Sequence, residues 1–444
     1  MKLIQTIKNI WKIEDLRKRL TITFMFLVIY RFGCQVVLPG IDPTQLDALK
    51  SFTDSGLMQL LDMFSGGAFS QASIFALGIM PYITASIVIQ LLGMVMPSFQ
   101  KMQREGESGR MKLNQYTRYL TVIILLVQAP AYLINLRVQV QSAGGHVDMG
   151  WGTMIFLMIV LTAGAMFIMW LGEKITDKGI GNGISLIIFV GIIARFPSAI
   201  SQEFVSRLDN NAQGGLVMFL VEIIVLFAVT AGAVMLTQGT RKVPVQYAKR
   251  IVGNKQYGGA RQYIPLKVNA ANVMPIIFAQ ALMFIPITLA GFGAKDNGFL
   301  GSVANVFGDM NGFWYNLVYF LLIVAFTYFY TAITVRPTQM AEEMKKNSGF
   351  IPGIKPGKKT AEYLDSIMSR ITLPGSIFLG IVAIMPAFAR LLGVNQSFAQ
   401  FFGGTSLLIS VGVILDTLQQ IETHLRMHHY DGLMKSGKIK GRSA

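Results

Sequence analysis

The chain has 444 residues, of which 52% are hydrophobic and only 14% charged, and its formal net charge is +16. Soluble domains carry about 25% charged residues, so this composition disfavours a soluble enzyme. It favours a protein that faces lipid, because charged side chains are costly at the centre of a bilayer. The single cysteine, Cys34, leaves no partner for an intramolecular disulfide.

The first 19 residues are basic and amphipathic, with Leu3, Ile7 and Trp11 near one helical face. They contain neither the apolar run nor the cleavage site of a secretory signal peptide. We expect residues 1–19 to form a helix on the cytoplasmic membrane surface, the alternative being a plain basic cap before the first span.

Ten stretches are apolar and long enough to cross a bilayer, which takes about 20 residues. Each should be a helix, because lipid offers no partner to a free backbone amide. Of the 39 Lys and Arg residues, 32 fall in the termini and alternate connections on one side, which the positive-inside rule makes the cytoplasm. The sequence thus predicts an all-α polytopic protein with both termini cytoplasmic. The expected spans lie near residues 20–38, 74–96, 119–136, 151–171, 183–200, 215–237, 270–292, 313–335, 371–391 and 403–421.

Residues 57–96 are apolar over a length too great for one span, with a break at Ser65, Gly66 and Gly67. Non-helical backbone survives at membrane depth only where protein or a water-filled cavity covers it. We therefore expect residues 57–73 to re-enter the membrane from outside as a short piece. An ordinary outer loop packed on the rim is the alternative.

Ten spans divide into two groups of five, and a duplicated half with an odd number of spans would be inverted. We expect an N-terminal half at 20–200, a C-terminal half at 201–421 and a cytoplasmic tail at 422–444. This symmetry follows from parity, since no residue-level repeat is evident.

No enzyme, cofactor or metal motif is evident in the sequence. The stretch at 353–360 resembles a phosphate loop, but it has three residues between its glycines and Lys-Lys-Thr in place of Lys-Thr. It is typical of a Pro/Gly turn that displays cations. His424 and His428 could share a helical face, but a pair beside a basic tail is more often solvated than metal-bound.

Charged residues within the expected spans are few, and the main cases are Glu222 and Asp416, with Arg31 in the first span. Each is a functional candidate by its position, although a helix contact, or snorkelling of Arg31, would also explain them. Their scatter does not form a proton relay, which weighs against an ion-coupled transporter.

The connection at 238–269 carries seven Lys and Arg residues, no acidic residue, and interleaved tyrosines. Such a projection suits RNA phosphate or an acidic protein surface, the alternative being a loop that touches anionic lipid. Because it is longer than topology requires, we interpret it as a docking arm. The connection at 336–370 is similar but also contains acidic residues.

Isoleucines four residues apart recur in the expected spans, as at Ile79 and Ile83 and at Ile188 and Ile192. Each pair shares one helix face. Stiff, branched side chains could form a narrow, dry constriction that gates by dewetting. On residue pattern alone, lipid-facing or core packing is the commoner explanation.

Seven stretches of the chain form distinctive motifs: MFSGGAFSQASIFALGIMPYITASIVIQLL (63–92), EGESGRMKLNQYTRY (105–119), MWLGEKITDKGIGNGISLIIF (169–189), YAKR (247–250), PLKVN (265–269), FIPGIKPGKKTAEYLD (350–365) and FFGGTSLLIS (401–410). Through these stretches the chain resembles the SecY family, the channel subunits of the bacterial Sec translocon, from residue 20 to about 430.

The resemblance implies ten helices in two inverted halves that form a clamshell around an hourglass pore. A short plug helix at about 57–73 would close the outer side, with Phe64, Ser65, Gly66 and Gly67 in its motif. An apolar ring would line the constriction. By motif position the ring comprises Ile79, Ile83, Ile188, Ile192, Ile277 and Ile409.

The resemblance also implies a lateral gate between the second and seventh helices, which an apolar signal sequence or new span would wedge open. The polar candidates that tune this gate are Thr84, Gln128 and Asn272. Signal sequences, nascent chains and membrane lipids are the expected ligands.

The resemblance implies that a separate partner drives transport, either the SecA ATPase or the translating ribosome, and that it would dock on the cytoplasmic loops at 238–269 and 336–370. The contact candidates are Tyr247, Lys249, Arg250, Lys255 and Lys355. Lys355 stands where the family usually has Arg, and it lacks the bidentate fork of Arg. The family also has a pair of basic residues near Lys255, and here one member of that pair is the uncharged Asn254. The expected partners include SecE and SecG or an equivalent, and the expected location is the bacterial inner membrane.

Two other classes remain open on sequence alone. An inverted-repeat secondary transporter would need a polar site at the membrane middle, where this chain offers isoleucines. A structural membrane scaffold would show no transport.

Overall fold

The structure is a computed structural model, and its chain divides into two compact units. The first unit holds the residues up to Ser201 together with those from Val413 onward, and the second is Gln202–Gly412. The residues that the structure describes are 13–41, 62–142, 150–208, 215–247, 250–252, 255–257, 261–271, 273–280, 282–283 and 312–435.

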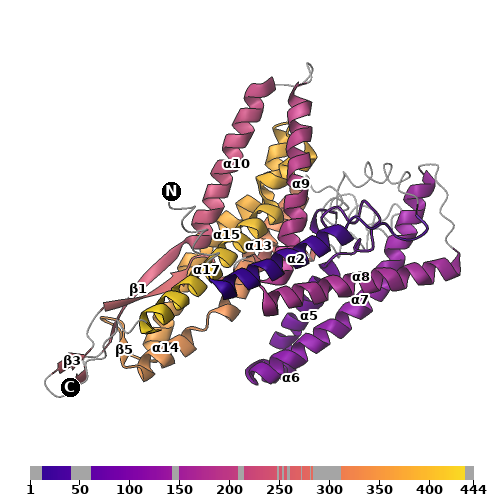
Figure 1. Ribbon diagram of the computed structural model, residues 1–444. Coiled ribbons are helices and arrows are strands. Elements are labelled where there is room, and N and C mark those ends of the chain that lie inside the picture. Colours follow the sequence, from indigo (N-terminus) through magenta and orange to yellow (C-terminus); the bar gives the residue numbers. More distant parts are fainter. Residues whose placement is uncertain are drawn as a thin grey trace. The chain divides into compact units, whose positions relative to one another are not determined.

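The first unit is built from long helices (Figure 1). Helices α5 and α7 pack on each other, as do α7 and α8, and α2 packs on α8. The apolar runs predicted from the sequence form these helices, and prolines mark two of their starts, since proline fits the first helical turn. The helices are α2 (Glu14–Gly33), α5 (Met80–Val95), α6 (Pro97–Arg104), α7 (Glu107–Ser142), α8 (Trp151–Lys178), most of α9 (Gly183–Leu208) and most of α17 (Gly404–Lys435).

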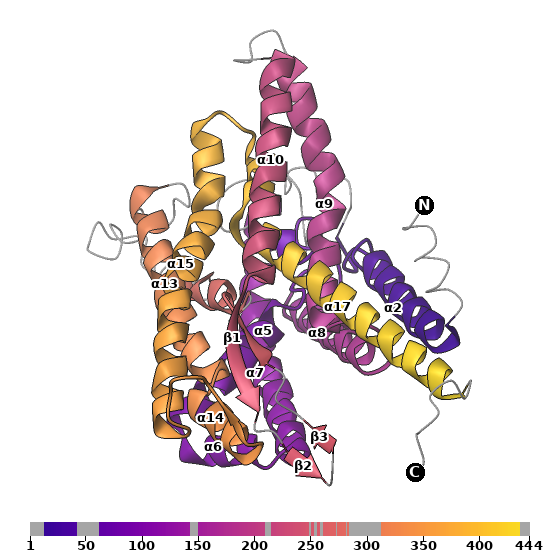
Figure 2. The same cartoon turned by 90° about the vertical axis from the view of Figure 1, so that its left-hand side faces the viewer.

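The second unit combines further apolar helices with a small sheet (Figure 2). Helices α13 and α15 lie side by side, and α14 packs on α15. The helical elements are α10 (Gly215–Gln238), α13 (Phe313–Thr334), α14 (Pro337–Lys346), α15 (Lys358–Leu391), α16 (Gln396–Ala399) and the 3-10 turn η2 (Gln400–Phe402).

A three-stranded sheet in the order β4-β1-β5 forms in the second unit. Strand β1 (Thr240–Tyr247) pairs antiparallel with β4 (Arg261–Lys267) and, at its end, with β5 (Gly349–Phe350). A separate hairpin joins β2 (Arg250–Val252) to β3 (Lys255–Tyr257). The sequence analysis expected a docking arm at 238–269 but no strands within this all-α protein.

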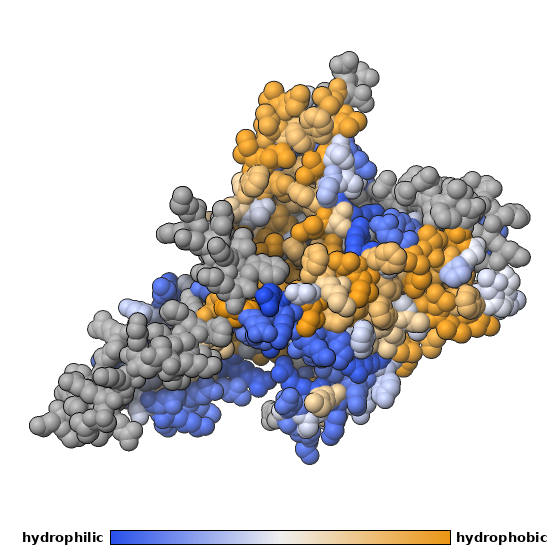
Figure 3. Space-filling model, viewed as in Figure 1, coloured by the Kyte–Doolittle hydropathy of each residue, from blue (hydrophilic) through white to orange (hydrophobic). Residues whose placement is uncertain are grey.

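Seven helices within the described ranges are long and apolar enough to cross a membrane, and an eighth is possible if α5 and α6 count as one broken span. These two helices meet at a bend of 103°. Figure 3 shows hydrophobic side chains over the exposed surface of α10 and, in the other unit, of α8. The prediction of an α-helical polytopic membrane protein is confirmed. The count of ten spans stays a prediction, since about half of the expected span at 270–292 lies outside the described residues.

The span predicted at 74–96 corresponds to helix α5, which starts at Met80, six residues later than expected. Residues 65–79 form turns and one β-bridge residue. Gly78 has φ of +56°, in the left-handed region that ends helical geometry, and Pro81 stands in the first helical turn. The helix therefore does not extend before Met80, and residues 65–79 form a non-helical segment.

Candidate functional site

A segment at 62–73, here called the buried segment, lies at the centre of the first unit. All of its residues except Gln71 are buried, and Asp62 and Ser73 have no exposed surface. After one helical turn at 62–64 its backbone runs in turns, and Gly66 and Gly67 take φ of +69° and +89°. The part of the predicted plug at 57–61 lies outside the described residues.

Helix α2 binds the backbone of the buried segment. The Tyr30 hydroxyl donates to the Ser65 carbonyl at 3.2 Å, and Arg31 Nη1 donates to the Gly66 carbonyl at 2.5 Å. The Cys34 thiol lies 3.7 Å from the same Ser65 oxygen. Arg31 therefore contacts the buried segment directly. The sequence analysis had left a functional role, a helix contact and snorkelling open for this residue.

An ion pair ties the buried segment to α9. Arg195 Nη2 donates to Asp62 Oδ2, and the other carboxylate oxygen of Asp62 accepts the backbone N–H of Ser70 at 2.7 Å. Buried charges are stable only when they are paired and hydrogen-bonded. Both oxygens of Asp62 meet that requirement, so the carboxylate holds the segment to its surroundings and also holds its own fold.

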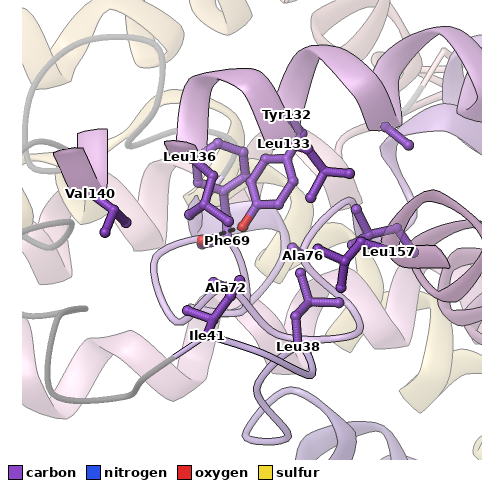
Figure 4. Packing of buried hydrophobic residues seen from close by; sticks show 12 residues of the cluster. Leu38, Ile41, Phe69, Ala72, Ala76, Tyr132, Leu133, Leu136, Val140 and Leu157 are labelled. Atoms are coloured by element: carbon purple, nitrogen blue, oxygen red, sulfur yellow. Dashed lines mark hydrogen bonds between the residues drawn. The ribbon is translucent and has the colours of Figure 1, made fainter. Parts of the chain in front are cut away.

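The second half of the buried segment, with Phe69 and Ala72, packs in an apolar cluster with residues of α7 and α8 (Figure 4). The Tyr132 hydroxyl donates to the Phe69 carbonyl at 3.0 Å, and the two rings meet edge to face at 4.8 Å between centroids. Leu38 N donates to the Ala72 carbonyl at 2.9 Å. Apolar burial thus adds to the polar anchors. The cluster comprises Leu38, Ile41, Phe69, Ala72, Ala76, Ala129, Tyr132, Leu133, Leu136, Val140, Leu157 and Leu161.

Two glycines form the seat of the buried segment. A Cβ on Gly66 would lie 2.9 Å from the Gly191 Cα, and a Cβ on Gly78 would lie 3.4 Å from the Ser65 Cα. Gly78 and Gly191 directly precede Ile79 and Ile192 in the chain. The segment is therefore seated next to two of the predicted ring residues.

The predicted ring residues are placed in both units. Ile79, Ile188 and Ile192 are buried in the first unit, and Ile83 is half-buried there. In the second unit Ile409 is buried and Ile277 is half-buried.

The two ring candidates of the second unit lie on elements in close contact. A Cβ on Gly412 would lie 2.9 Å from Val273 Cγ2. Ile277 and Ile409 each lie about one helical turn from this contact, so each shares its helix face. The ring assignment itself stays a prediction.

The gate candidates divide differently. Thr84 is half-buried on α5, and its hydroxyl donates to the Met80 carbonyl at 3.1 Å. Gln128 is exposed on α7, the helix that packs against α5. Asn272 lies outside the described residues. Gln128 is therefore free to meet a ligand, whereas the hydroxyl of Thr84 is already bonded within its own helix.

The two predicted docking loops fold together within the second unit. Gln246 and Tyr247 of β1 pair with Phe350 and Gly349 of β5. Behind the sheet, α14 and the start of α15 complete one apolar core. The described parts of both loops therefore belong to one folded surface. The buried core residues are Val243, Val245, Leu266, Met344, Ile351, Leu364 and Met368.

The individual docking candidates lie at different places around this sheet. Tyr247 is half-buried at the end of β1, and Lys355 is exposed in the turn before α15, where its carbonyl accepts the Thr360 hydroxyl at 3.0 Å. Arg250 and Lys255 lie on the β2–β3 hairpin. Lys249 lies outside the described residues. Positive φ at Gly353 and Gly357 shapes the Lys355 turn, as the Pro/Gly pattern predicted.

Sequence reasoning missed two buried charged contacts. The sequence analysis singled out none of the residues involved, which are Asp62, Arg195, Glu203 and Arg207. Asp62 and Arg195 are 133 residues apart, so no local pattern joins them. Glu203 and Arg207 stand four residues apart on α9, a spacing that places them on one helix face and could have been noticed.

These features define a polytopic membrane protein that holds a protein-covered, non-helical segment among its spans and displays a basic sheet. A family model described as SecY matches residues 73–418. The chain is 44% identical over 436 residues to the protein translocase subunit SecY of Streptomyces scabiei, covering 96% of this chain and 98% of the relative. It is 43% identical over 440 residues to that of Corynebacterium glutamicum, with the same shares covered. The chain belongs to the SecY family.

Solved structures share the fold at low sequence identity. A structure described as a protein-conducting channel matches with a TM-score of 0.59 and 19% identity, over 92% of each chain. Sec61 in the canine ribosome-channel complex from the endoplasmic reticulum matches with a TM-score of 0.55 and 19% identity, also over 92% of each chain. These likenesses support the predicted fold class, and the family match favours the channel over the transporter alternative.

Proposed function

We propose that the chain is the protein-conducting channel of a Sec translocon in the inner membrane of a bacterium. It passes unfolded, signal-bearing proteins across the membrane and releases apolar segments sideways into lipid. Membership of the SecY family supports this function. The observation that carries it is the buried segment, seated on Gly78 and Gly191 beside Ile79 and Ile192.

In the idle channel the buried segment acts as a plug above an apolar ring. Ile79, Ile83, Ile188 and Ile192 contribute from the first unit, and Ile277 and Ile409 from the second. A narrow apolar constriction excludes water and ions by dewetting. The polar anchors of the plug bind backbone carbonyls and one carboxylate, which gives the closed state a defined position that a passing chain must displace.

The release of apolar segments into lipid requires a lateral gate. The polarity of this gate sets how apolar a signal sequence must be to open it. Thr84, Gln128 and Asn272 are the proposed gate residues. A signal sequence enters because it prefers lipid to water, and polar side chains at the gate make the closed seam less favourable. The exposed position of Gln128 on α7 supports its part in this role.

The chain supplies no driving force of its own in this account. Under the proposal, SecA or a ribosome docks on the sheet, with contacts at Tyr247, Lys249, Arg250, Lys255 and Lys355. The joining of the two loops through β1 and β5 supports a single docking surface. SecE and SecG, or an equivalent, complete the complex. Both termini lie in the cytoplasm, as the distribution of Lys and Arg favours.

A disulfide that locks the plug tests the proposal. Cys34 is the only cysteine and its sulfur lies 3.7 Å from the Ser65 carbonyl, so Ser65→Cys creates one defined pair. Oxidation should block translocation by the reconstituted complex, and reduction should restore it. The wild-type chain, oxidised in the same way, is the control. Full translocation with the disulfide formed would contradict a plug role for this segment.

A further inference from the structure

A cluster of three buried charged residues lies at the end of the α9–α10 pair, here called the clasp: Glu203, Arg207 and Glu222. Arg207 Nε donates to Glu203 Oε1 at 2.8 Å, and its Nη2 donates to Glu222 Oε1 at 2.5 Å. The three side chains are only 1%, 6% and 3% exposed. The proposed channel mechanism makes no use of them.

The clasp also binds backbone from a third part of the second unit. Arg207 Nη2 donates to the Gly393 carbonyl at 2.9 Å, and the backbone N–H of Asn395 donates to Glu203 Oε2 at 2.9 Å. Gly393 and Asn395 follow α15 and precede α16. The clasp thus joins the end of α9, the first half of α10 and the turn after α15 (Figure 2).

Ring packing strengthens the same junction. Phe204 on α9 meets Phe219 on α10 edge to face, with 5.5 Å between centroids. Among the described residues, Glu222 Oε2 is buried and has no hydrogen-bond partner. One guanidinium, that of Arg207, also faces two carboxylates. Buried ion pairs of this kind contribute little net stability compared with apolar packing. Their effect here is to fix which segments lie against one another.

The earlier part of α9 is bound elsewhere. Gly191 lies against the buried segment and Arg195 pairs with Asp62, both in the first unit. The boundary between the two units falls inside this one helix, after Ser201. Helix α9 is therefore fixed at one end to the plug seat and at the other end to the clasp.

Between these two anchors the helix is weakened. Pro197 has no N–H to donate to the carbonyl four residues earlier, and proline inside a helix is a usual cause of a kink. The hydroxyls of Ser198 and Ser201 bond back to the carbonyls of Arg195 and Ser198 at 2.8 and 2.9 Å. Such bonds accompany helix bending.

We propose that the clasp makes the last turns of α9 part of the second unit, so that α9 bends at 196–202, around Pro197, when the channel opens. The clasp is then a positioning device, and Glu222 gains a role in it. This inference rests on the proposed function. It places the bending point within the helix instead of beyond Leu208.

Spin-label distances in the reconstituted complex, in a Cys34→Ser background, test this bending point. Val205 on α9, Leu391 at the end of α15 and Ile155 on α8 are exposed enough to carry labels after substitution by cysteine. Distances are compared between the idle complex and one stalled with a preprotein. We expect the Val205–Leu391 distance to stay constant and the Val205–Ile155 distance to shift. The opposite pattern, or no shift in either pair, would overturn the inference.

A variant of the clasp gives a second readout. Arg207→Gln should broaden the Val205–Leu391 distances and make them respond to stalling. Arg390→Gln removes an arginine from the last turn of α15 and is the matched control. An unchanged distance distribution in Arg207→Gln would also overturn the inference. Translocation is measured separately in the same variants. A result that refutes the bending site can therefore be distinguished from one that refutes the channel function.

Discussion

Arg195 on α9 forms an ion pair with Asp62, a residue with no exposed surface in the segment that we propose as the plug. The pair joins two parts of the chain that no sequence pattern connects. The Arg195 side chain is 30% exposed, whereas Asp62 is fully buried. Removing Arg195 therefore leaves a buried carboxylate uncompensated, which in buried ion pairs costs about 3–5 kcal/mol. The plug position should therefore depend strongly on these two side chains.

Neutralising either residue of this pair should raise ion leak through the closed channel, by an amount that differs among the variants. Arg195→Gln leaves the Asp62 carboxylate buried and unpaired, so it should raise ion leak in planar bilayers more than Asp62→Asn, whose amide oxygen still accepts from Ser70. The double variant should leak less than Arg195→Gln alone. Equal, wild-type leak in all three would show that the pair does not hold the plug.

A side chain added to the plug where it meets the glycine seat should displace the plug by steric contact. In Gly66→Ala the new Cβ would lie 2.9 Å from the Gly191 Cα, too close for a real contact. Gly67→Ala is the matched control, because Gly67 also has positive φ but its nearest atom lies 3.8 Å away. Gly66→Ala should leak more than Gly67→Ala. Equal conductance in the two variants would mean that backbone strain alone, and not the seat, explains any leak.

The polarity of the gate residues should set how hydrophobic a signal sequence must be to open the channel. Replacing Gln128 or Asn272 by Leu makes the closed seam more apolar, so more hydrophobic signal sequences should be needed to open it. A series of preproteins with graded signal hydrophobicity measures this threshold. Val127→Leu, at an exposed neighbouring position on α7, is the control. A threshold that stays the same in both Leu variants would refute the gate assignment.

Motor docking should depend on the exposed turn at Lys355. Lys355→Glu reverses a charge where the motor is proposed to bind, and it should abolish SecA-driven transport while leaving idle ion conductance unchanged. Lys178→Glu makes the same change of charge at an exposed position in the last turn of α8, outside both docking loops, and is the matched control. Normal SecA-driven transport in the Lys355→Glu variant would remove this residue from the docking surface.

Hydropathy was sufficient to predict the apolar helices. Helices α8, α10 and α13 coincide closely with expected spans, since a run of 20 or more apolar residues in a bilayer has few alternatives to a helix. The start of α5 was misplaced because apolar content does not distinguish a helix from a covered, turn-rich segment. The left-handed backbone geometry at Gly78 keeps the helix from starting before this residue.

The small sheet carried a signal that was overlooked. In β1, Val243 and Val245 are buried while Lys242 and Pro244 are exposed, which is the alternation of a strand. Its pairing with β5, about 100 residues further on, could not be read from spacing. The same limit applies to Asp62 and Arg195, because long-range pairs follow from the packing of helices and leave no local pattern in the sequence.

Protease protection of a preprotein tests the central claim most directly. The chain is reconstituted with SecE in vesicles, and SecA, ATP and a signal-bearing preprotein are added. The account predicts that the preprotein becomes protected only when ATP and its signal are both present. If SecA and the preprotein bind but no protected preprotein forms, the chain is not the channel proposed here.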